Sequence, residues 1–196
     1  DMVHHTRAVT GTAPRAFVIG DMPWLSYHVS IEDSVRNAGR MVRDGGAEAV
    51  KLEGGRKRLP MIRAVLDAEI PVMGHLGLTP QSVHAMGGYR VQGKQVEAAR
   101  ELIADARALD QAGVFSIVLE GVPNLLAELI TKEVSAPTIG IGAGARCDGQ
   151  VLVFHDVVGL TGDAHVAKFV RRYADLESAA LDAVRRFFAD VQKGEF

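Results

Sequence analysis

Two opposite charges stand two residues apart in an otherwise apolar run, AVKLEGG at residues 49–55. Alternate residues of a strand point to the same side, so Lys51 and Glu53 would share one face of a sheet. A surface salt bridge would explain a single pair of this kind. The explanation therefore depends on whether other strands end in the same way.

Three other apolar runs also carry a titratable residue near their carboxyl ends. Asp21 ends the first run, His75 lies near the end of the third, and Glu120 lies near the end of the fourth. Four separate surface contacts are a poor explanation of this repeated pattern. The pattern instead predicts that the four strand ends converge on one site that holds an acid and a cation toward a ligand.

The carboxylates of this predicted site point to a metal ion. Carboxylates that converge repel one another unless one is protonated or a cation lies between them. One or two carboxylates, completed by water and substrate oxygens, are typical of magnesium. Asp21 and Glu53 are therefore the predicted Mg²⁺ ligands. The alternative is that Asp21 caps the following turn and Glu53 pairs with Lys51.

The elements that must position these residues alternate between strand and helix. Apolar residues three and four apart fill the stretches between the first five strands, as in helices. Ser30, with Asp33 three residues later, predicts one helix start, Gly113 predicts a helix end, and Pro123 fits the first turn of a third helix. The expected strands are residues 15–21, 49–55, 71–77, 116–122, 138–144 and 151–159.

This alternation predicts an α/β protein with a parallel sheet. A doubly wound sheet would show a glycine-rich phosphate turn after its first strand, whereas the first strand here ends in GDMPW. A (β/α)8 TIM barrel places its functional residues at the carboxyl ends of many strands, as observed for the four runs. We therefore expect a barrel, formed as a single domain over residues 1–196.

Composition narrows the class of protein further. The chain has 196 residues, is 47% hydrophobic and 23% charged, and can bury a sizeable core. Its net charge of −2 suggests neither a nucleic acid nor an anionic membrane as partner. Cys147 is the only cysteine, which excludes an internal disulfide and fits a reducing compartment. No apolar stretch approaches the roughly 20 residues of a membrane span, so we expect a cytoplasmic protein.

The sequence also resembles the ketopantoate hydroxymethyltransferase family across nearly its whole length. The matching segments are GDMPWLSY, AVKLEGG, PVMGHLGLTPQSVHAMGGYRVQGK, VLEGVP, TIGIGAG, CDGQVLVFHD and KFVRRYADL, in the family's order. The resemblance implies a magnesium-dependent barrel that transfers a one-carbon unit from 5,10-methylenetetrahydrofolate to 3-methyl-2-oxobutanoate. The product would be ketopantoate, in the synthesis of pantothenate and coenzyme A, and the enzyme would be a homo-oligomer.

Matched position by position, the resemblance assigns roles to five residues. Asp21 would bind magnesium and lie against the keto acid, and Glu53 would bind the metal directly or through water. Lys51 would contact the keto acid, and His75 would line the same pocket. Glu120 would accept the proton. The resemblance identifies no folate-binding residues.

The sequence also departs from the family pattern. Its six candidate strands correspond to strands three to eight of the barrel, followed by C-terminal helices, so we expect the first two strands to be absent from this chain. In the family those strands supply an Asp-Ser pair that helps to bind magnesium and keto acid. We therefore expect these residues alone to associate through open sheet edges and to lack full activity.

Two other functions remain open from the sequence. A lyase of the isocitrate lyase or phosphoenolpyruvate-utilising type would use a similar magnesium-enolate site. It would need a reactive cysteine on a mobile loop, and Cys147 lies too close to GIGAG for that role. The other alternative is a truncated barrel that acts as a non-catalytic subunit.

Overall fold

The computed structural model describes residues 1–162 and 166–195. The chain divides into two compact units, Asp1–Gln150 and Val151–Phe196. The four strand ends that carry the predicted site all belong to the first unit. The expectation of one domain over residues 1–196 stays a prediction.

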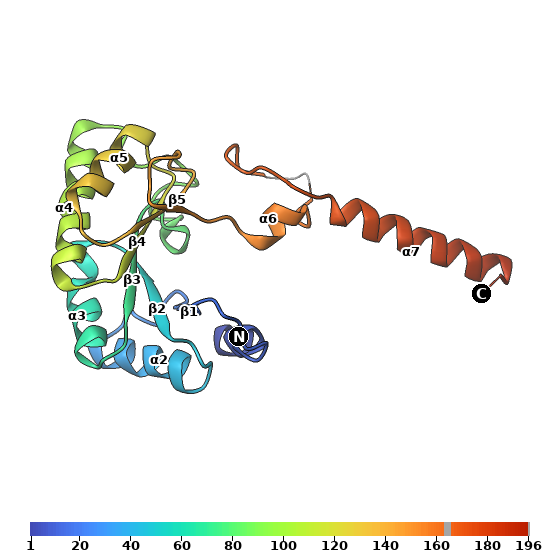
Figure 1. Cartoon of the computed structure of the whole chain (residues 1–196), viewed down its shortest axis with the longest axis horizontal. Helices are drawn as coiled ribbons and strands as arrows, with labels where there is room; N and C mark the ends of the chain where they lie inside the picture. The colour runs from blue at the N-terminus through green and yellow to red at the C-terminus, as the bar shows by residue number, and fades with distance from the viewer. Residues whose placement is uncertain (163–165, 196) are drawn as a thin grey trace. The chain divides into compact units, whose positions relative to one another are not determined.

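The first unit is built on a curled, six-stranded parallel sheet whose strands follow one another in chain order (Figure 1). Every neighbouring pair of strands is parallel. The predicted α/β class and parallel sheet are thus confirmed, and the six strands fit a partial barrel. The strands are β1 (Ile19–Asp21), β2 (Ala49–Glu53), β3 (Val72–Gly77), β4 (Ser116–Glu120), β5 (Thr138–Ile141) and β6 (Gly149–Gln150).

A helix connects each of the first four strands to the next, as expected of βαβ units. Successive helices of this layer contact one another and cover one side of the sheet (Figure 1). They are α2 (Ile31–Arg43), α3 (Leu59–Asp67), α4 (Val96–Ala112) and α5 (Asn124–Glu133). An additional helix, α1 (Met2–Thr10), precedes β1, and two short 3₁₀ helices lie at η1 (Arg56–Arg58) and η2 (Pro80–Ser82).

Local signals in the sequence account for the ends of these helices. The Ser30 side chain accepts a hydrogen bond of 3.0 Å from the backbone N–H of Asp33, which confirms the predicted cap of α2. Gly113 ends α4 in the left-handed conformation, at φ 92°. Pro123 is the N-cap of α5, one residue before the helix begins. The helix boundaries thus follow from residue types within a few positions.

The two faces of the sheet differ in burial. Residues that point toward the helices, such as Leu52, Val72 and Ile117, are completely buried and form the core. A Cβ added to Gly74 would lie 2.8 Å from Leu109 Cδ1, so this glycine lets α4 pack closely on β3. On the opposite face, Met73 is only half-buried. That opposite face also carries Lys51, Glu53 and His75, because these side chains contact one another.

The sixth predicted strand was placed wrongly. Residues 151–159 were expected to form it, but β6 is only Gly149–Gln150, and Phe154–Val158 form a short helix, α6. β6 pairs with β5 through two residues, Gly149 with Ile139 and Gln150 with Gly140. The apolar run VLVFHDVVG thus contains a short helix instead of a strand. Gly159, with φ 67°, ends this helix.

The second unit contains α6 and the longer helix α7 (Leu176–Lys193). The Asp175 side chain accepts a hydrogen bond from the Ser178 N–H and so caps α7. Backbone bonds from Tyr173 N to Val157 O and from Glu177 N to Gly159 O join the segment around α6 to the start of α7. None of the helices in the described residues is both long and apolar enough to cross a membrane.

Candidate active site

The register of the sheet brings the four predicted strand ends together. Asp21 lies opposite Lys51, Glu53 lies opposite His75, and Gly77 lies opposite Glu120. On β2 and β3, the residue opposite the previous strand's site residue therefore lies two positions before the residue opposite the next strand's site residue, Lys51 before Glu53 and His75 before Gly77. Since alternate residues of a strand share a face, this stagger keeps all five site residues on one side of the sheet.

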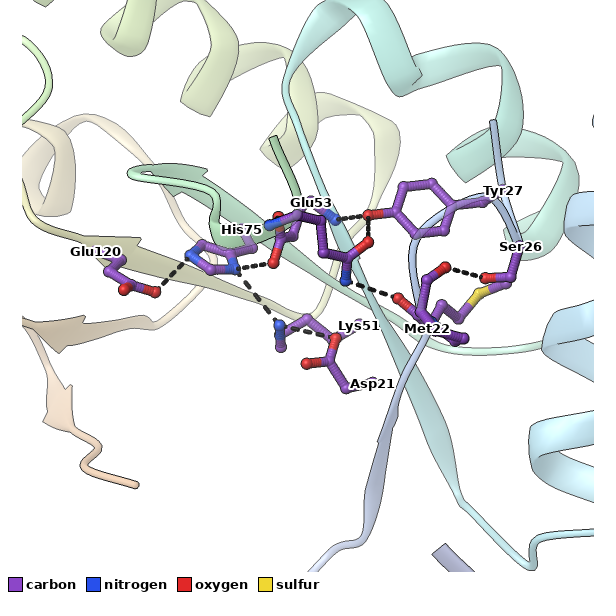
Figure 2. A network of polar contacts seen from close by, with 10 residues as sticks. Asp21, Met22, Ser26, Tyr27, Lys51, Glu53, His75 and Glu120 are labelled. Carbon is purple, nitrogen blue, oxygen red and sulfur yellow. Dashed lines mark hydrogen bonds and ion pairs between the residues drawn. The ribbon is translucent and has the colours of Figure 1, made fainter. Parts of the chain in front are cut away.

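His75 is the centre of the resulting network (Figure 2). Its Nε2 atom lies 3.2 Å from Glu120 Oε2, and its Nδ1 atom lies 3.4 Å from Lys51 Nζ and 3.7 Å from Glu53 Oε1. A lysine ammonium can only donate hydrogen bonds, so the contact with Lys51 favours an unprotonated Nδ1. The ring proton then resides on Nε2 and faces the Glu120 carboxylate.

Lys51 connects this centre to Asp21. Its Nζ atom lies 2.8 Å from Asp21 Oδ1, which is an ion-pair distance. The Asp21 side chain is 44% exposed, whereas those of His75 and Glu53 are 3% and 5% exposed. The network thus runs from a buried centre to an accessible carboxylate, and a ligand can reach it from the side of Asp21.

Two atoms of the network retain unused hydrogen-bonding capacity. Within the described residues, neither Asp21 Oδ1 nor His75 Nε2 has a well-aligned hydrogen bond, although both are buried from solvent. Their charged neighbours lie at ion-pair distance but in poor alignment. Buried polar atoms without a partner are costly, so these two atoms are suited to meet a bound ligand or ion.

A frame of hydrogen bonds fixes Glu53 in position. The backbone N–H of Gln81 donates to Glu53 Oε2 at 3.0 Å, and the Gln81 side chain accepts from the Tyr27 hydroxyl at 2.7 Å and donates to Met22 O at 2.9 Å. The Tyr27 hydroxyl in turn accepts a bond of 3.2 Å from the Glu53 N–H. The segments that follow β1 and β3 are thereby tied to the end of β2 (Figure 2).

Burial controls the protonation of this frame. It raises the pKa of the Glu53 carboxyl, an effect that nearby His75 and Lys51 partly oppose. Burial also raises the pKa of the Tyr27 hydroxyl well above its ordinary value. The Tyr27 hydroxyl therefore keeps its proton and remains a donor to Gln81.

The carboxylates fit a magnesium ion only in part. Asp21 fits as a direct ligand, because its Oδ1 has no aligned hydrogen bond and its side chain is accessible. Glu53 does not fit as a direct metal ligand, because its oxygens face Gln81 N and His75. It fits as an acceptor of a hydrogen bond from a metal-bound water. In the part of the chain that the structure describes, no group of three or more His, Cys, Asp or Glu side chains forms a metal cluster.

The five predicted residues therefore meet, but in pairs that the sequence did not indicate. Lys51 pairs with Asp21, not with its strand neighbour Glu53. Tyr27 and Gln81 were not predicted, although both lie in the segments GDMPWLSY and HLGLTPQS that carried the resemblance. Cys147 is partly buried beside Thr131 and Thr138, and burial raises its thiol pKa, which disfavours a reactive thiolate.

Comparisons with known proteins identify the family of this chain. A sequence model of the family described as ketopantoate hydroxymethyltransferase matches residues 1–196. Three curated relatives, each named 3-methyl-2-oxobutanoate hydroxymethyltransferase, align with all 196 residues. The Geobacter metallireducens protein is 56% identical to this chain, which covers 73% of that protein's length. The Syntrophomonas wolfei protein is 55% identical, with 71% of its length covered. The Koribacter versatilis protein is 58% identical, with 66% of its length covered.

Solved structures of TIM-barrel enzymes share the fold. A phosphonopyruvate hydrolase in complex with oxalate and Mg²⁺ superimposes with a TM-score of 0.56 at 15% identity, over 100% of this chain and 68% of that one. A lyase or mutase of Burkholderia cenocepacia gives a TM-score of 0.53 at 17% identity, over 100% and 68%. At this level of identity the likeness extends to the fold alone.

The family assignment rests on the sequence matches, which span the whole chain and every residue of the site. Because the family model covers residues 1–196 and the relatives are more than half identical over the same residues, the chain belongs to the ketopantoate hydroxymethyltransferase family.

Proposed function

We propose that the protein transfers a hydroxymethyl group from 5,10-methylenetetrahydrofolate to 3-methyl-2-oxobutanoate, which gives ketopantoate for pantothenate and coenzyme A synthesis. The observation that carries this proposal is the continuous network of five side chains at the ends of four adjacent strands. That network combines a cation, an accessible carboxylate and a partly buried carboxylate. These are the groups required to bind a keto acid and remove its proton.

Lys51 and Asp21 would hold the keto acid. The Lys51 ammonium is 18% exposed and lies at the accessible end of the network, where it would contact the substrate's carboxylate. Asp21 fits a magnesium ion there, with Glu53 accepting from a water of that ion. Negative charge that develops on the keto acid's oxygens would be stabilised by magnesium when it is bound.

Glu120 would act as the general base. Its side chain is 16% exposed, and its Oε2 atom lies 3.2 Å from His75 Nε2, so the carboxylate is held at the site and remains accessible to a substrate. The proton at C3 of the keto acid would pass to Glu120. The resulting carbon nucleophile would bond to the methylene carbon of the folate while the bonds from that carbon to N5 and N10 break. Water would supply the hydroxyl group of the product, and tetrahydrofolate would leave with one proton from Glu120 and one from that water.

We also propose a cytoplasmic enzyme that works as a homo-oligomer. The single cysteine and the small net charge support the first statement. The second follows from the family resemblance. Neither statement is needed for the chemistry of the five residues.

Exchange of the C3 proton of 3-methyl-2-oxobutanoate with deuterated water tests the proposal directly. With magnesium present, the protein should catalyse this exchange, and Glu120→Gln should slow it by on the order of 10² to 10⁴. Glu97 is exposed and distant in sequence from the site, so Glu97→Gln is the matched control and should exchange at the parental rate.

Ketopantoate formation in the presence of the folate is measured in parallel. If exchange survives in Glu120→Gln while product formation is lost, Glu120 acts in the folate half of the reaction instead. If the full-length protein binds magnesium and keto acid but neither exchanges the proton nor forms product, the proposed function is wrong, and a non-catalytic role is favoured.

A further inference from the structure

Beside the candidate active site lies a second group of basic side chains that the proposed chemistry does not use. It consists of His28, in the segment after β1, and of Lys57 and Arg58, in η1 after β2. We call these three side chains the basic rim. The neighbouring Arg56 differs, because it is already paired with Asp105 and Glu101.

The basic rim has no acidic partner. Over the described ranges, Lys57, Arg58 and His28 form no ion pair and no side-chain hydrogen bond with the rest of the protein. The Nδ1 atom of His28 is buried without a partner. Burial lowers the pKa of His28, and the charges of Arg58 and Lys57 lower it further, so the positive charge of the basic rim comes from Lys57 and Arg58. Such a group is stabilised by an anion that is not part of the protein.

The packing of Arg58 places this group next to the active site. A Cβ on Gly54 would stand 2.8 Å from Arg58 Cγ, so the stem of the arginine lies over the backbone of Gly54, the residue after Glu53. Gly54 has φ 116°, a conformation that favours glycine and leaves room for this stem. His28 is held from the other side, since its ring lies 4.2 Å from that of Tyr27, whose hydroxyl contacts Glu53.

The same segment also presents apolar side chains to solvent. Trp24, Leu25 and Val29 are 61%, 48% and 68% exposed. Leu25 has φ 67°, an unfavourable conformation for a branched residue. The surface around the rim therefore offers both apolar area and positive charge, which suits a ligand that joins an aromatic ring to carboxylates.

We propose that the basic rim binds the carboxylate-bearing glutamyl tail of the folate co-substrate, while the folate's one-carbon unit faces the keto acid at Lys51 and Glu120. This inference rests on the proposed function, because that function supplies the folate. Lys51 and Asp21 would serve the keto acid, so the rim provides the separate positive charge that a second anionic substrate requires. A tail with more glutamates would meet more of this charge and bind more tightly.

Fluorescence titration tests this proposal, because Trp24 is the only tryptophan and lies in the segment that carries His28. Two forms of tetrahydrofolate, one with a single glutamate and one with three, are each titrated into the protein in the absence of keto acid. The parental protein should bind the triglutamate on the order of tenfold more tightly, and this preference should decrease at high salt. In Lys57→Gln/Arg58→Gln, the ratio of the two dissociation constants should fall toward one.

The control variant removes the same two charges elsewhere. Arg63 and Arg100 are exposed residues of α3 and α4, so Arg63→Gln/Arg100→Gln should keep the parental preference for the triglutamate. A γ-linked triglutamate peptide without the pterin, and inorganic phosphate, are added as competitors. The peptide should weaken binding of the triglutamate form at concentrations at which phosphate does not.

Three results would overturn the proposal: no preference in the parental protein, an unchanged preference in Lys57→Gln/Arg58→Gln, or equal competition by phosphate. Turnover with the monoglutamate is measured separately. A protein that prefers the triglutamate but forms no ketopantoate would retain this inference and refute the proposed function. A protein that forms ketopantoate but does not prefer the triglutamate would refute this inference and retain the proposed function.

Discussion

Replacement of Gly77 by alanine tests how closely the end of β3 must approach β4. Gly77 has φ 92°, and a Cβ at this position would lie 2.2 Å from Glu120 O and 2.6 Å from Val122 Cγ1. Gly113 has the same φ of 92°, but a Cβ there meets nothing within 4 Å. The two glycines therefore share the same φ and differ in what surrounds them.

The expected loss of unfolding free energy follows from this comparison. Alanine in a left-handed conformation costs about 1 to 2 kcal/mol, which applies to both positions. Overpacking adds about 1 to 3 kcal/mol at Gly77 only, because the Glu120 carbonyl is held by a 2.8 Å bond from Leu78 N and cannot simply move away. We expect Gly77→Ala to lose about 2 to 5 kcal/mol of unfolding free energy and Gly113→Ala about 1 to 2 kcal/mol.

The displacement should also reach the active site. Glu120 must shift if an alanine at position 77 is to fit, and its carboxylate then leaves His75 Nε2, now 3.2 Å away. A shift of about 1 Å can cost on the order of 10²-fold in rate, so ketopantoate formation should fall in Gly77→Ala and not in Gly113→Ala. Urea midpoints at constant m-value give the stabilities, and product formation gives the rates. Equal losses of stability in the two variants would refute the argument from close approach.

Three further predictions concern individual side chains of the site. Tyr27→Phe leaves two buried groups, Glu53 N–H and Gln81 Oε1, without the hydroxyl. It should cost roughly 2 to 4 kcal/mol in urea unfolding, whereas Tyr89→Phe at a 75% exposed position should stay within about 0.5 kcal/mol. Lys51→Met removes the cation 2.8 Å from Asp21 and should raise KM for the keto acid about 10- to 100-fold; an unchanged KM would exclude Lys51 from substrate binding. Burial raises the pKa of Glu53 above 4.5, so its contribution to stability is present below that pH and is lost as pH rises through the higher folded-state pKa. As pH rises, the urea midpoint of the parental protein should therefore fall relative to that of Glu53→Gln. If the midpoints of the two proteins vary with pH in parallel, burial does not raise the pKa of Glu53.

Much of the fold follows from local features of the sequence. The first five strands lie within the apolar runs that predicted them, and Ser30 and Gly113 mark helix ends where expected. These signals act over a few residues, through capping bonds and φ preference, so they can be read without the fold. The prediction of a strand at residues 151–159 was wrong because this run is apolar enough for either a strand or a short helix. Pairing with β5 ends at Gln150, before the run begins, and the run contains a short helix.

The sequence alone also led to a prediction of which residues would carry the chemistry. Titratable side chains at the ends of parallel strands must lie at the same edge of a sheet, whatever the details of its packing. Asp21, Lys51, Glu53, His75 and Glu120 were found in this way, and the structure brings them together.

Only the tertiary structure decided which of these residues touch. The two-residue stagger between neighbouring strands sets Lys51 against Asp21 and places His75 between Glu53 and Glu120. The role of Gln81 depends on a turn that returns to the end of β2 from 28 residues away. Such contacts arise from strand register and loop path, which are set by the packing of the whole sheet against its helices, and no local pattern in the sequence encodes them.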